Sequence, residues 1–113
     1  MVRIALDNSL SELPCSIAAV SCALGYVPKK LPSLRNDGWA TLNAANKFIR
    51  AHLRVKKRVN YKRGERPLLK DLHVGGKAIV CVHGHFLFLD HETYYSSYNN
   101  QCDKVVAVWL LNN

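Results

Sequence analysis

The chain has 113 residues, 49% of them hydrophobic and 21% charged, with a formal net charge of +8. This length and composition are typical of one globular domain, which we expect to span residues 1–113, and they exclude intrinsic disorder because apolar residues are spread along the whole chain. No apolar run approaches the roughly 18 to 20 residues of a membrane span, and Arg3, Asp7 and Glu12 interrupt the region where a signal peptide is apolar. We therefore expect a cytoplasmic protein without membrane contact.

Helical patterns occupy the N-terminal half. We expect one helix over Ser9–Gly25, because Pro14 fits a first turn, apolar residues recur at helical spacing and a glycine stands at the end. The stretch Tyr26–Gly38 contains Pro, Asn, Asp and Gly and is a predicted loop. The apolar stripe that follows predicts a second helix from about Asp37, its expected cap, to Leu53.

A basic strand follows the second helix. The stretch Val55–Lys62 alternates between apolar and polar residues, which predicts a half-buried strand with a basic outer face. Its apolar face comprises Val55, Val59 and Tyr61. The strand lies within residues 47–70, which contain ten basic residues and one acidic residue and which we name the basic band. Such a band attracts phosphate, acidic proteins or anionic surfaces, or it is a solvated face.

The remaining chain predicts a helical turn and four strands. The turn is expected at Pro67–Leu72, and the strands at Lys77–Val82, His85–Asp90, Thr93–Tyr98 and Lys104–Leu111. These strands are rich in β-branched and aromatic residues, and glycines separate the first of them from the turn. Two helices followed by four consecutive strands predict an α+β fold that ends in an antiparallel meander.

Four cysteines stand at widely spaced positions, Cys15, Cys22, Cys81 and Cys102, and we expect them reduced. A free cysteine is most often a core residue, so only its position can single one out. Cys15 lies in the first turn of the first predicted helix, where backbone N–H groups and the helix dipole favour the thiolate and lower the pKa of the thiol. The same N–H groups suit the oxyanion of a tetrahedral intermediate. Asn8 is either a further oxyanion donor or an ordinary turn residue.

A cysteine nucleophile needs a base, and His85 is the best placed of the five histidines because it opens an apolar strand directly after a glycine. His83 is the alternative. If residues 91 and 92 form the tip of the next hairpin, Tyr98 falls opposite His85 and Ser96 lies diagonally on the same face. Ser96 is then the polar group within reach that orients the imidazole.

Two stretches of the chain resemble a known family. PCSIAAVSCALGY (Pro14–Tyr26) resembles the nucleophile helix of small papain-like cysteine peptidase-fold proteins, which are common in phages and mobile elements. Leu68–Asn100 resembles the second half of these proteins, with a short helix, a glycine, an apolar strand, Gly-His, another strand and a hairpin. The order of Cys before His is also that of papain.

The resemblance implies a single papain-like α+β domain, in which an N-terminal nucleophile-bearing helix packs on a C-terminal antiparallel sheet. It also implies that Cys15 is the nucleophile and His85 the base, and it places Ser96 where the family has an orienting Asp or Asn. The function implied is that of a cysteine peptidase or amide hydrolase that acts on a peptide or protein substrate through an acyl-enzyme.

Two other chemistries are weaker. A zinc or iron site would draw on Cys81, His83, His85, Asp90, His91 and Cys102. Gly84 interrupts the face on which the first three would lie, and the ligand spacing is looser than in structural zinc sites. We therefore predict no metal and no cofactor. A nuclease with a tyrosine nucleophile would use the histidine pair, but its other motifs are absent.

The stronger alternative is a non-catalytic phage accessory or virion protein that binds nucleic acid or an acidic partner through the basic band. Lysine and arginine side chains bind phosphates by counterion release, and no sequence-reading motif is present, so binding would be nonspecific and salt dependent. The contacts would come from Arg54, Lys56, Arg58, Lys62, Arg63 and Arg66.

Overall fold

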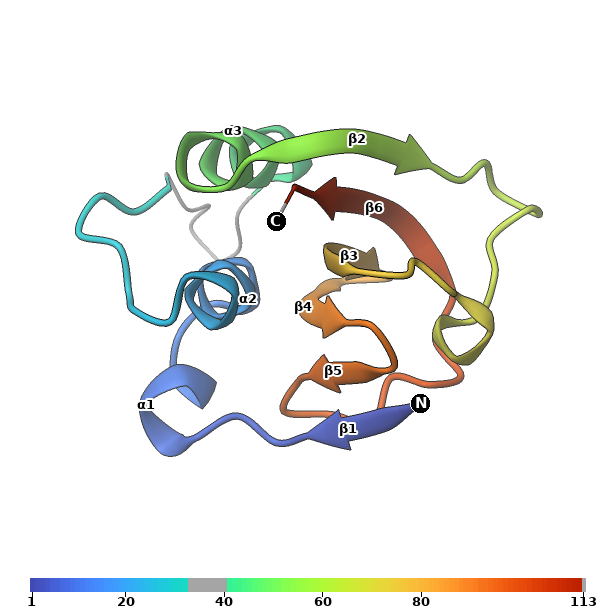
Figure 1. Cartoon of the computed structure of the whole chain (residues 1–113), viewed down its shortest axis with the longest axis horizontal. Helices are drawn as coiled ribbons and strands as arrows, with labels where there is room; N and C mark the ends of the chain where they lie inside the picture. Colours follow the sequence, from blue (N-terminus) through green and yellow to red (C-terminus); the bar gives the residue numbers. More distant parts are fainter. Residues whose placement is uncertain (33–40, 113) are drawn as a thin grey trace.

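The computed structural model describes residues 1–32 and 41–112. Its helices are α1 (Asn8–Ser11), α2 (Cys15–Leu24) and α3 (Leu42–His52), with one 3₁₀ turn, η1 (Leu69–Asp71), among the described residues. Its strands are β1 (Val2–Ile4), β2 (Val55–Asn60), β3 (Lys77–Val82), β4 (His85–Asp90), β5 (Thr93–Tyr95) and β6 (Val105–Leu111). Helices α2 and α3 lie against the same face of the sheet (Figure 1). The predicted α+β class is confirmed.

The strands form one mixed sheet in the order β1-β5-β4-β3-β6-β2. Strands β3, β4 and β5 follow one another antiparallel as predicted, with Asp90 opposite Thr93. The predicted meander is wrong for the last strand, because β6 does not pair with β5 but returns to lie antiparallel beside β3. The position next to β5 is instead occupied by β1, which pairs with β5 in parallel. Strand β6 is apolar on both faces, and this composition suits an interior position covered from both sides.

The single N-terminal helix predicted over Ser9–Gly25 is in fact two helices. Asp7 caps α1 by accepting the Leu10 N–H at 3.0 Å. Pro14 is extended at its position before α2, with ψ of 141°, and it has no N–H to continue a helix through this point. The chain therefore turns at Pro14, and α2 begins anew at Cys15.

The second predicted helix is α3, and it begins later than expected. The Thr41 hydroxyl accepts the Ala44 N–H at 3.1 Å and so caps the helix. The predicted cap, Asp37, lies outside the described residues. The amide oxygen of Asn46 accepts the Trp109 indole N–H at 2.9 Å, which ties α3 to β6.

The faces of β2 differ from the prediction because the strand contains a bulge. Its register against β6 shifts between Val55 and Lys57. Val55 consequently packs with the helices, whereas Tyr61 packs on the opposite face of the sheet. Arg58, expected on the outer face, instead places its guanidinium 4.9 Å from the centre of the Trp109 ring on the helix side.

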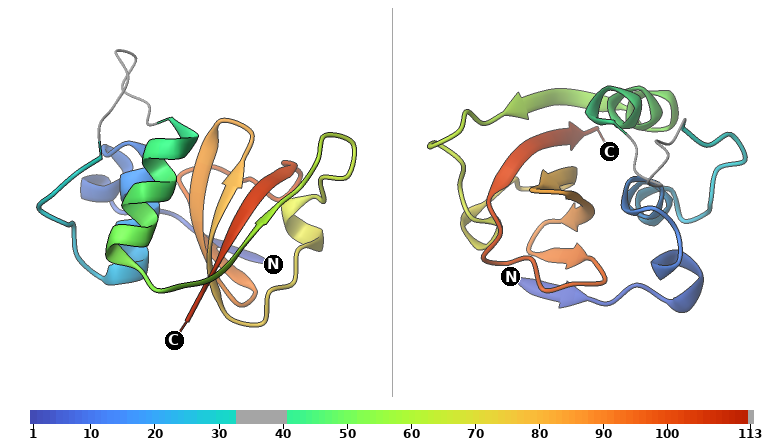
Figure 2. Two further views of the ribbon diagram at one scale, coloured as in Figure 1. Left: turned by 90° about the horizontal axis from the view of Figure 1, so that it is seen from above. Right: turned by 180° about the vertical axis from the view of Figure 1, so that it is seen from behind.

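Two apolar cores cover the two faces of the sheet. One lies between the sheet and the helices α2 and α3, which pack side by side (Figure 2), and contains the fully buried Trp109. The other lies under η1 and contains Leu69, Leu87 and Tyr94. Strands β3 and β4 are buried on both faces over most of their length. Among the residues that the structure describes, no helix has the length and apolar character to cross a membrane.

Candidate active site

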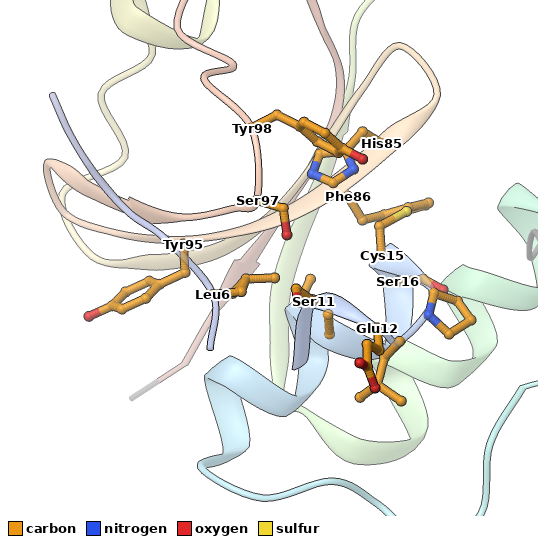
Figure 3. A pocket seen from close by; sticks show the side chains of 14 residues that line it. Leu6, Ser11, Glu12, Cys15, Ser16, His85, Phe86, Tyr95, Ser97 and Tyr98 are labelled. Atoms are coloured by element: carbon orange, nitrogen blue, oxygen red, sulfur yellow. The ribbon is translucent and has the colours of Figure 1, made fainter. Parts of the chain in front are cut away.

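A cavity of about 310 Å³ lies where the start of α2 faces the start of β4 (Figure 3). Cys15 and His85 both line this cavity, together with other residues of α2 and β4, the segment before α1, the end of α1 and the turn after it, and the end of β5 with the segment that follows. Asn8 is exposed in α1 and does not line it. The fold therefore brings the predicted nucleophile and the predicted base, which are far apart in the sequence, to one cavity.

Cys15 stands at a helix start with free backbone donors. Pro14 makes no side-chain cap, and the first hydrogen bond of the helix runs from the Ala18 N–H to the Pro14 carbonyl at 3.0 Å. The N–H groups of Cys15 and Ser16 therefore have no partner within the helix. These groups are available to a developing oxyanion.

The acidity of Cys15 differs from the expectation. Burial raises the pKa of its thiol, and the backbone N–H groups of Phe86, Ser16 and Cys15 itself lower it by less. The prediction of a lowered pKa is therefore wrong, because Cys15 is half-buried against the sheet and desolvation of the thiolate outweighs the stabilising N–H groups. At neutral pH Cys15 is a thiol, and it needs a base to react.

His85 is presented by the tight hairpin between β3 and β4. Gly84 in this turn has φ of 71°, a left-handed conformation that glycine adopts without strain. Burial lowers the pKa of the His85 imidazole, while the charge of Asp103 raises it by less. The ring is therefore neutral at pH 7 and can accept a proton.

A buried hydrogen-bond network begins at the imidazole. His85 Nε2 lies 2.9 Å from Ser96 Oγ. The Ser96 hydroxyl donates to Asn100 Oδ1 at 2.5 Å, and Asn100 Nδ2 donates to Asp103 Oδ2 at 2.7 Å. Ser96 is 1% and Asn100 4% exposed, whereas Asp103 is at the surface. We name Ser96, Asn100 and Asp103 the Ser–Asn–Asp network.

The structure brings together all three predicted residues, and Asn100 and Asp103, which the sequence pattern did not predict, extend the hydrogen bonding from Ser96. The predicted neighbourhood of His85 and Ser96 is confirmed by their hydrogen bond. Asn100 and Asp103 follow in the loop between β5 and β6, where periodicity no longer predicts direction. The signal that could have indicated them is an amide and a carboxylate shortly after the predicted orienting serine.

Tyr98 completes the surroundings of the imidazole. Its ring packs edge-on against His85, with the ring centres 5.5 Å apart (Figure 3). The predicted strand Thr93–Tyr98 ends at Tyr95, however, so Tyr98 contacts His85 from the segment after β5 and not as its partner in the sheet. The Tyr98 backbone N–H donates to Ser96 Oγ at 3.2 Å. The side chain of Tyr98 is nevertheless 65% exposed, so it stands at the mouth of the cavity.

The other cysteines lack such surroundings. Burial raises the pKa of Cys81 to about 12, which makes it an inert core thiol. Cys22 does not line the cavity of Cys15, and Cys102 is exposed. Across residues 1–32 and 41–112, no group of three His, Cys, Asp or Glu side chains is arranged to hold a metal ion.

The basic band divides into exposed and withdrawn residues. The exposed basic residues of the band are Lys47, Arg50, Arg54, Lys56, Lys57, Lys62, Arg63 and Lys70. Arg58 is half-buried on Trp109, and its Nε donates to Asn60 Oδ1 at 3.0 Å. Arg66 is also half-buried, and its charge, like that of Arg58, opposes the larger effect of burial on the pKa of Cys81. Four of the six predicted contact residues are therefore fully presented to a partner.

A comparison with known proteins finds no matching family model, no matching curated protein and no matching solved structure. The functional assignment therefore depends on the residues and the geometry described above.

Proposed function

We propose that the protein is a papain-like cysteine hydrolase that cleaves amide bonds in peptides or proteins. In this proposal Cys15 is the nucleophile, His85 is the base and Ser96 orients the base. The single observation that carries the proposal is the cavity lined by both Cys15 and His85, with the helix start of α2 in its wall. The papain-like relationship, and the phage or mobile-element setting that it implies, are part of the proposal.

The hydrogen bonding of His85 supports this reading over simple packing. Nε2 is engaged by Ser96, so Nδ1 is the nitrogen left for proton transfer. The cavity leaves room for a substrate carbonyl beside the thiol. A nucleophile, a base that is oriented by a third group, and backbone donors for the oxyanion are the parts that acyl transfer requires.

The reaction would proceed through an acyl-enzyme. His85 Nδ1 takes the proton of Cys15 Sγ while the sulfur forms a bond to the substrate carbonyl carbon, and the carbonyl oxygen becomes an oxyanion near the free N–H groups of α2. The C–N bond then breaks as the imidazolium gives its proton to the leaving amine. Water, deprotonated by His85, attacks the thioester and releases the acid and the Cys15 thiol.

The resting pair is neutral in this mechanism. Burial raises the pKa of Cys15 and lowers the pKa of His85, so at pH 7 the thiol keeps its proton and the imidazole carries no charge. The thiolate therefore forms only as His85 removes the proton during attack. Acylation of Cys15 consequently depends on His85 and not on an unusually acidic thiol.

The test uses p-nitrophenyl acetate as an activated acyl donor and then a mixed peptide library. We expect release of p-nitrophenol with transient acetylation of Cys15, identified by peptide mass mapping, and no turnover by Cys15→Ser. Library cleavage products that disappear in Cys15→Ser define the amide substrate. Acetylation that is spread over surface lysines and Cys102, unchanged in Cys15→Ser, would contradict the proposal.

A second candidate function is polyanion binding through the basic band. The observation that favours it is the exposure of five basic residues in and around the edge strand β2: Arg54 before the strand, Lys56 and Lys57 in it, and Lys62 and Arg63 in the loop that follows. These side chains can contact phosphates of a nucleic acid or carboxylates of an acidic protein. This function is compatible with catalysis at Cys15, since the exposed residues do not line its cavity.

A further inference from the structure

The Ser–Asn–Asp network has one consistent arrangement of its hydrogens. The Asp103 carboxylate only accepts, so the Asn100 amide must present Nδ2 to it, at 2.7 Å. Oδ1 of the same amide then faces Ser96, whose hydroxyl must donate to it at 2.5 Å. This order of donors starts at the carboxylate and requires no assumption about the histidine.

The order of donors determines the tautomer of His85. The Ser96 oxygen has used its one proton toward Asn100, and it also accepts the Tyr98 backbone N–H at 3.2 Å. His85 Nε2, which lies 2.9 Å away, must therefore be a donor. In the neutral ring Nδ1 is then without a proton, and it is the nitrogen that the proposed mechanism needs as the base.

We propose that Asn100 and Asp103 are positioning residues that act through Ser96. They hold His85 in the Nε2-protonated tautomer, and they stabilise the imidazolium that forms when Nδ1 takes the Cys15 proton. The second role rests on the proposed function, whereas the first does not. In that step the proton moves from Sγ to Nδ1, the sulfur electron pair forms the S–C bond, and the C=O π bond breaks with its electron pair moving to the oxygen. The new positive charge on the imidazolium faces a network that ends in a carboxylate.

The network also anchors a loop, and this structural role must be separated from the positioning role. The Asn100 backbone N–H donates to the Tyr94 hydroxyl at 3.2 Å, and the Asp103 backbone N–H donates to the Asn100 carbonyl at 3.0 Å. Neither bond uses the Asp103 carboxylate, which is at the surface. Removing the charge of Asp103 should therefore leave the fold intact and change only which groups of Asn100, Ser96 and His85 donate hydrogen bonds.

The substitution that tests the proposal is Asp103→Asn, because an amide can either donate to Asn100 or accept from it. The measurement is the ¹⁵N shift of both His85 ring nitrogens at neutral pH, from long-range ¹H–¹⁵N correlation on the full-length protein. We expect protonated Nε2 and unprotonated Nδ1 in the wild type, and a mixture of the two tautomers in Asp103→Asn. Asp103→Glu should restore the wild-type pattern, and Asp71→Asn, at another exposed aspartate, should not change it.

The outcomes separate this inference from the proposed function. A wild-type ring protonated on Nδ1, or a tautomer unaffected by Asp103→Asn, overturns the inference whether or not the protein is an enzyme. If the tautomers are as predicted but Cys15 is not acylated, the network controls the tautomer of His85 and its role in catalysis is overturned.

The kinetic arm measures acylation of Cys15 by p-nitrophenyl acetate. We expect Asp103→Asn to slow it about 10- to 100-fold relative to Asp71→Asn, the range found for hydrogen-bond partners that orient metal-bound histidines. Equal rates in the two variants overturn the catalytic part of the inference.

Discussion

The cavity of Cys15 and the exposed part of the basic band show two different ways in which a sequence presents functional groups. At the cavity, residues from α2, β4 and the loop after β5 converge, and His85, Ser96 and Asn100 are joined by hydrogen bonds. Along β2, basic side chains diverge into solvent from one edge of the sheet. Convergence of polar side chains from separate elements, more than charge density, therefore indicates a site for bond chemistry.

The largest effect is expected at His85, the base at the cavity. Replacing His85 by Ala removes the base, and acylation of Cys15 by p-nitrophenyl acetate should fall by about 1,000-fold, within the range for positioned general bases. Polyanion binding should stay unchanged. The matched control is His83→Ala, since His83 is exposed in the same hairpin and does not line the cavity. Equal losses in the two variants would show that the hairpin matters and the imidazole of His85 does not.

The second experiment measures how firmly the cavity wall is held. Ser96→Ala leaves the buried Asn100 Oδ1 and the half-buried His85 Nε2 without their hydrogen-bond partner, which should lower the free energy of unfolding by about 1–3 kcal/mol. Urea denaturation measures this change. Ser97→Ala is the matched control, because Ser97 is the next residue in the chain and is itself half-buried. A Ser96→Ala protein as stable as Ser97→Ala would mean that the network does not contribute to folding.

The third experiment tests whether the exposed residues of the basic band bind phosphates. The triple variant Lys56→Ala, Lys62→Ala, Arg63→Ala removes three exposed charges from the basic band. If these residues contact phosphates, the slope of log affinity for single-stranded DNA against log salt should become shallower by about 2, at roughly 0.7 per contact. Fluorescence anisotropy in a salt series measures the slope. Cys15 acylation should not change.

The control for that variant removes three exposed lysines outside the band, Lys29→Ala, Lys30→Ala and Lys77→Ala. It has the same net charge as the triple variant. Equal slopes in the two proteins would mean that DNA responds to overall charge and that the band is a solvated face.

The fourth experiment uses pH to distinguish the core thiol from the surface. Burial raises the pKa of Cys81 from 9.0 to about 12, so above pH 9 the unfolded chain releases this proton while the folded protein retains it. Stability should therefore fall as pH rises from 9 toward 12, by at most about 1.4 kcal/mol per pH unit from this group. Urea unfolding at pH 8 to 10.5 should show a smaller decline in Cys81→Ala. The exposed Cys102→Ala should decline like the wild type.

The central strands and the position of the nucleophile were predictable from local chemistry. The apolar run of β3 lies between Gly76 and Gly84, β4 begins directly after Gly84, and the predicted ends of both strands agree with the structure. Pro14 and the apolar spacing after it place Cys15 in the first turn of a helix, which is also observed. Each of these features depends on residues that are neighbours in the sequence.

The remaining features depend on contacts between distant residues. The bulge in β2 turns Arg58 onto Trp109, and alternation alone cannot reveal an extra residue in a strand. The pKa of Cys15 depends on how deeply α2 is buried against β4, which no local pattern contains. Asn100 reaches Ser96 through a loop whose path is set by the Tyr94 hydroxyl and the start of β6.

The most direct test of the account compares two reagents at two thiols. Iodoacetamide reacts according to thiolate fraction and exposure, so it should modify the exposed Cys102 faster than the half-buried Cys15. p-Nitrophenyl acetate requires a base and oxyanion donors, so at pH 7.5 it should acylate Cys15 faster than Cys102, as measured by time-resolved peptide mass mapping of the wild-type protein. The predicted result is that iodoacetamide prefers Cys102 and p-nitrophenyl acetate prefers Cys15. A preference for Cys102 with both would contradict the claim that Cys15 and His85 form a catalytic pair.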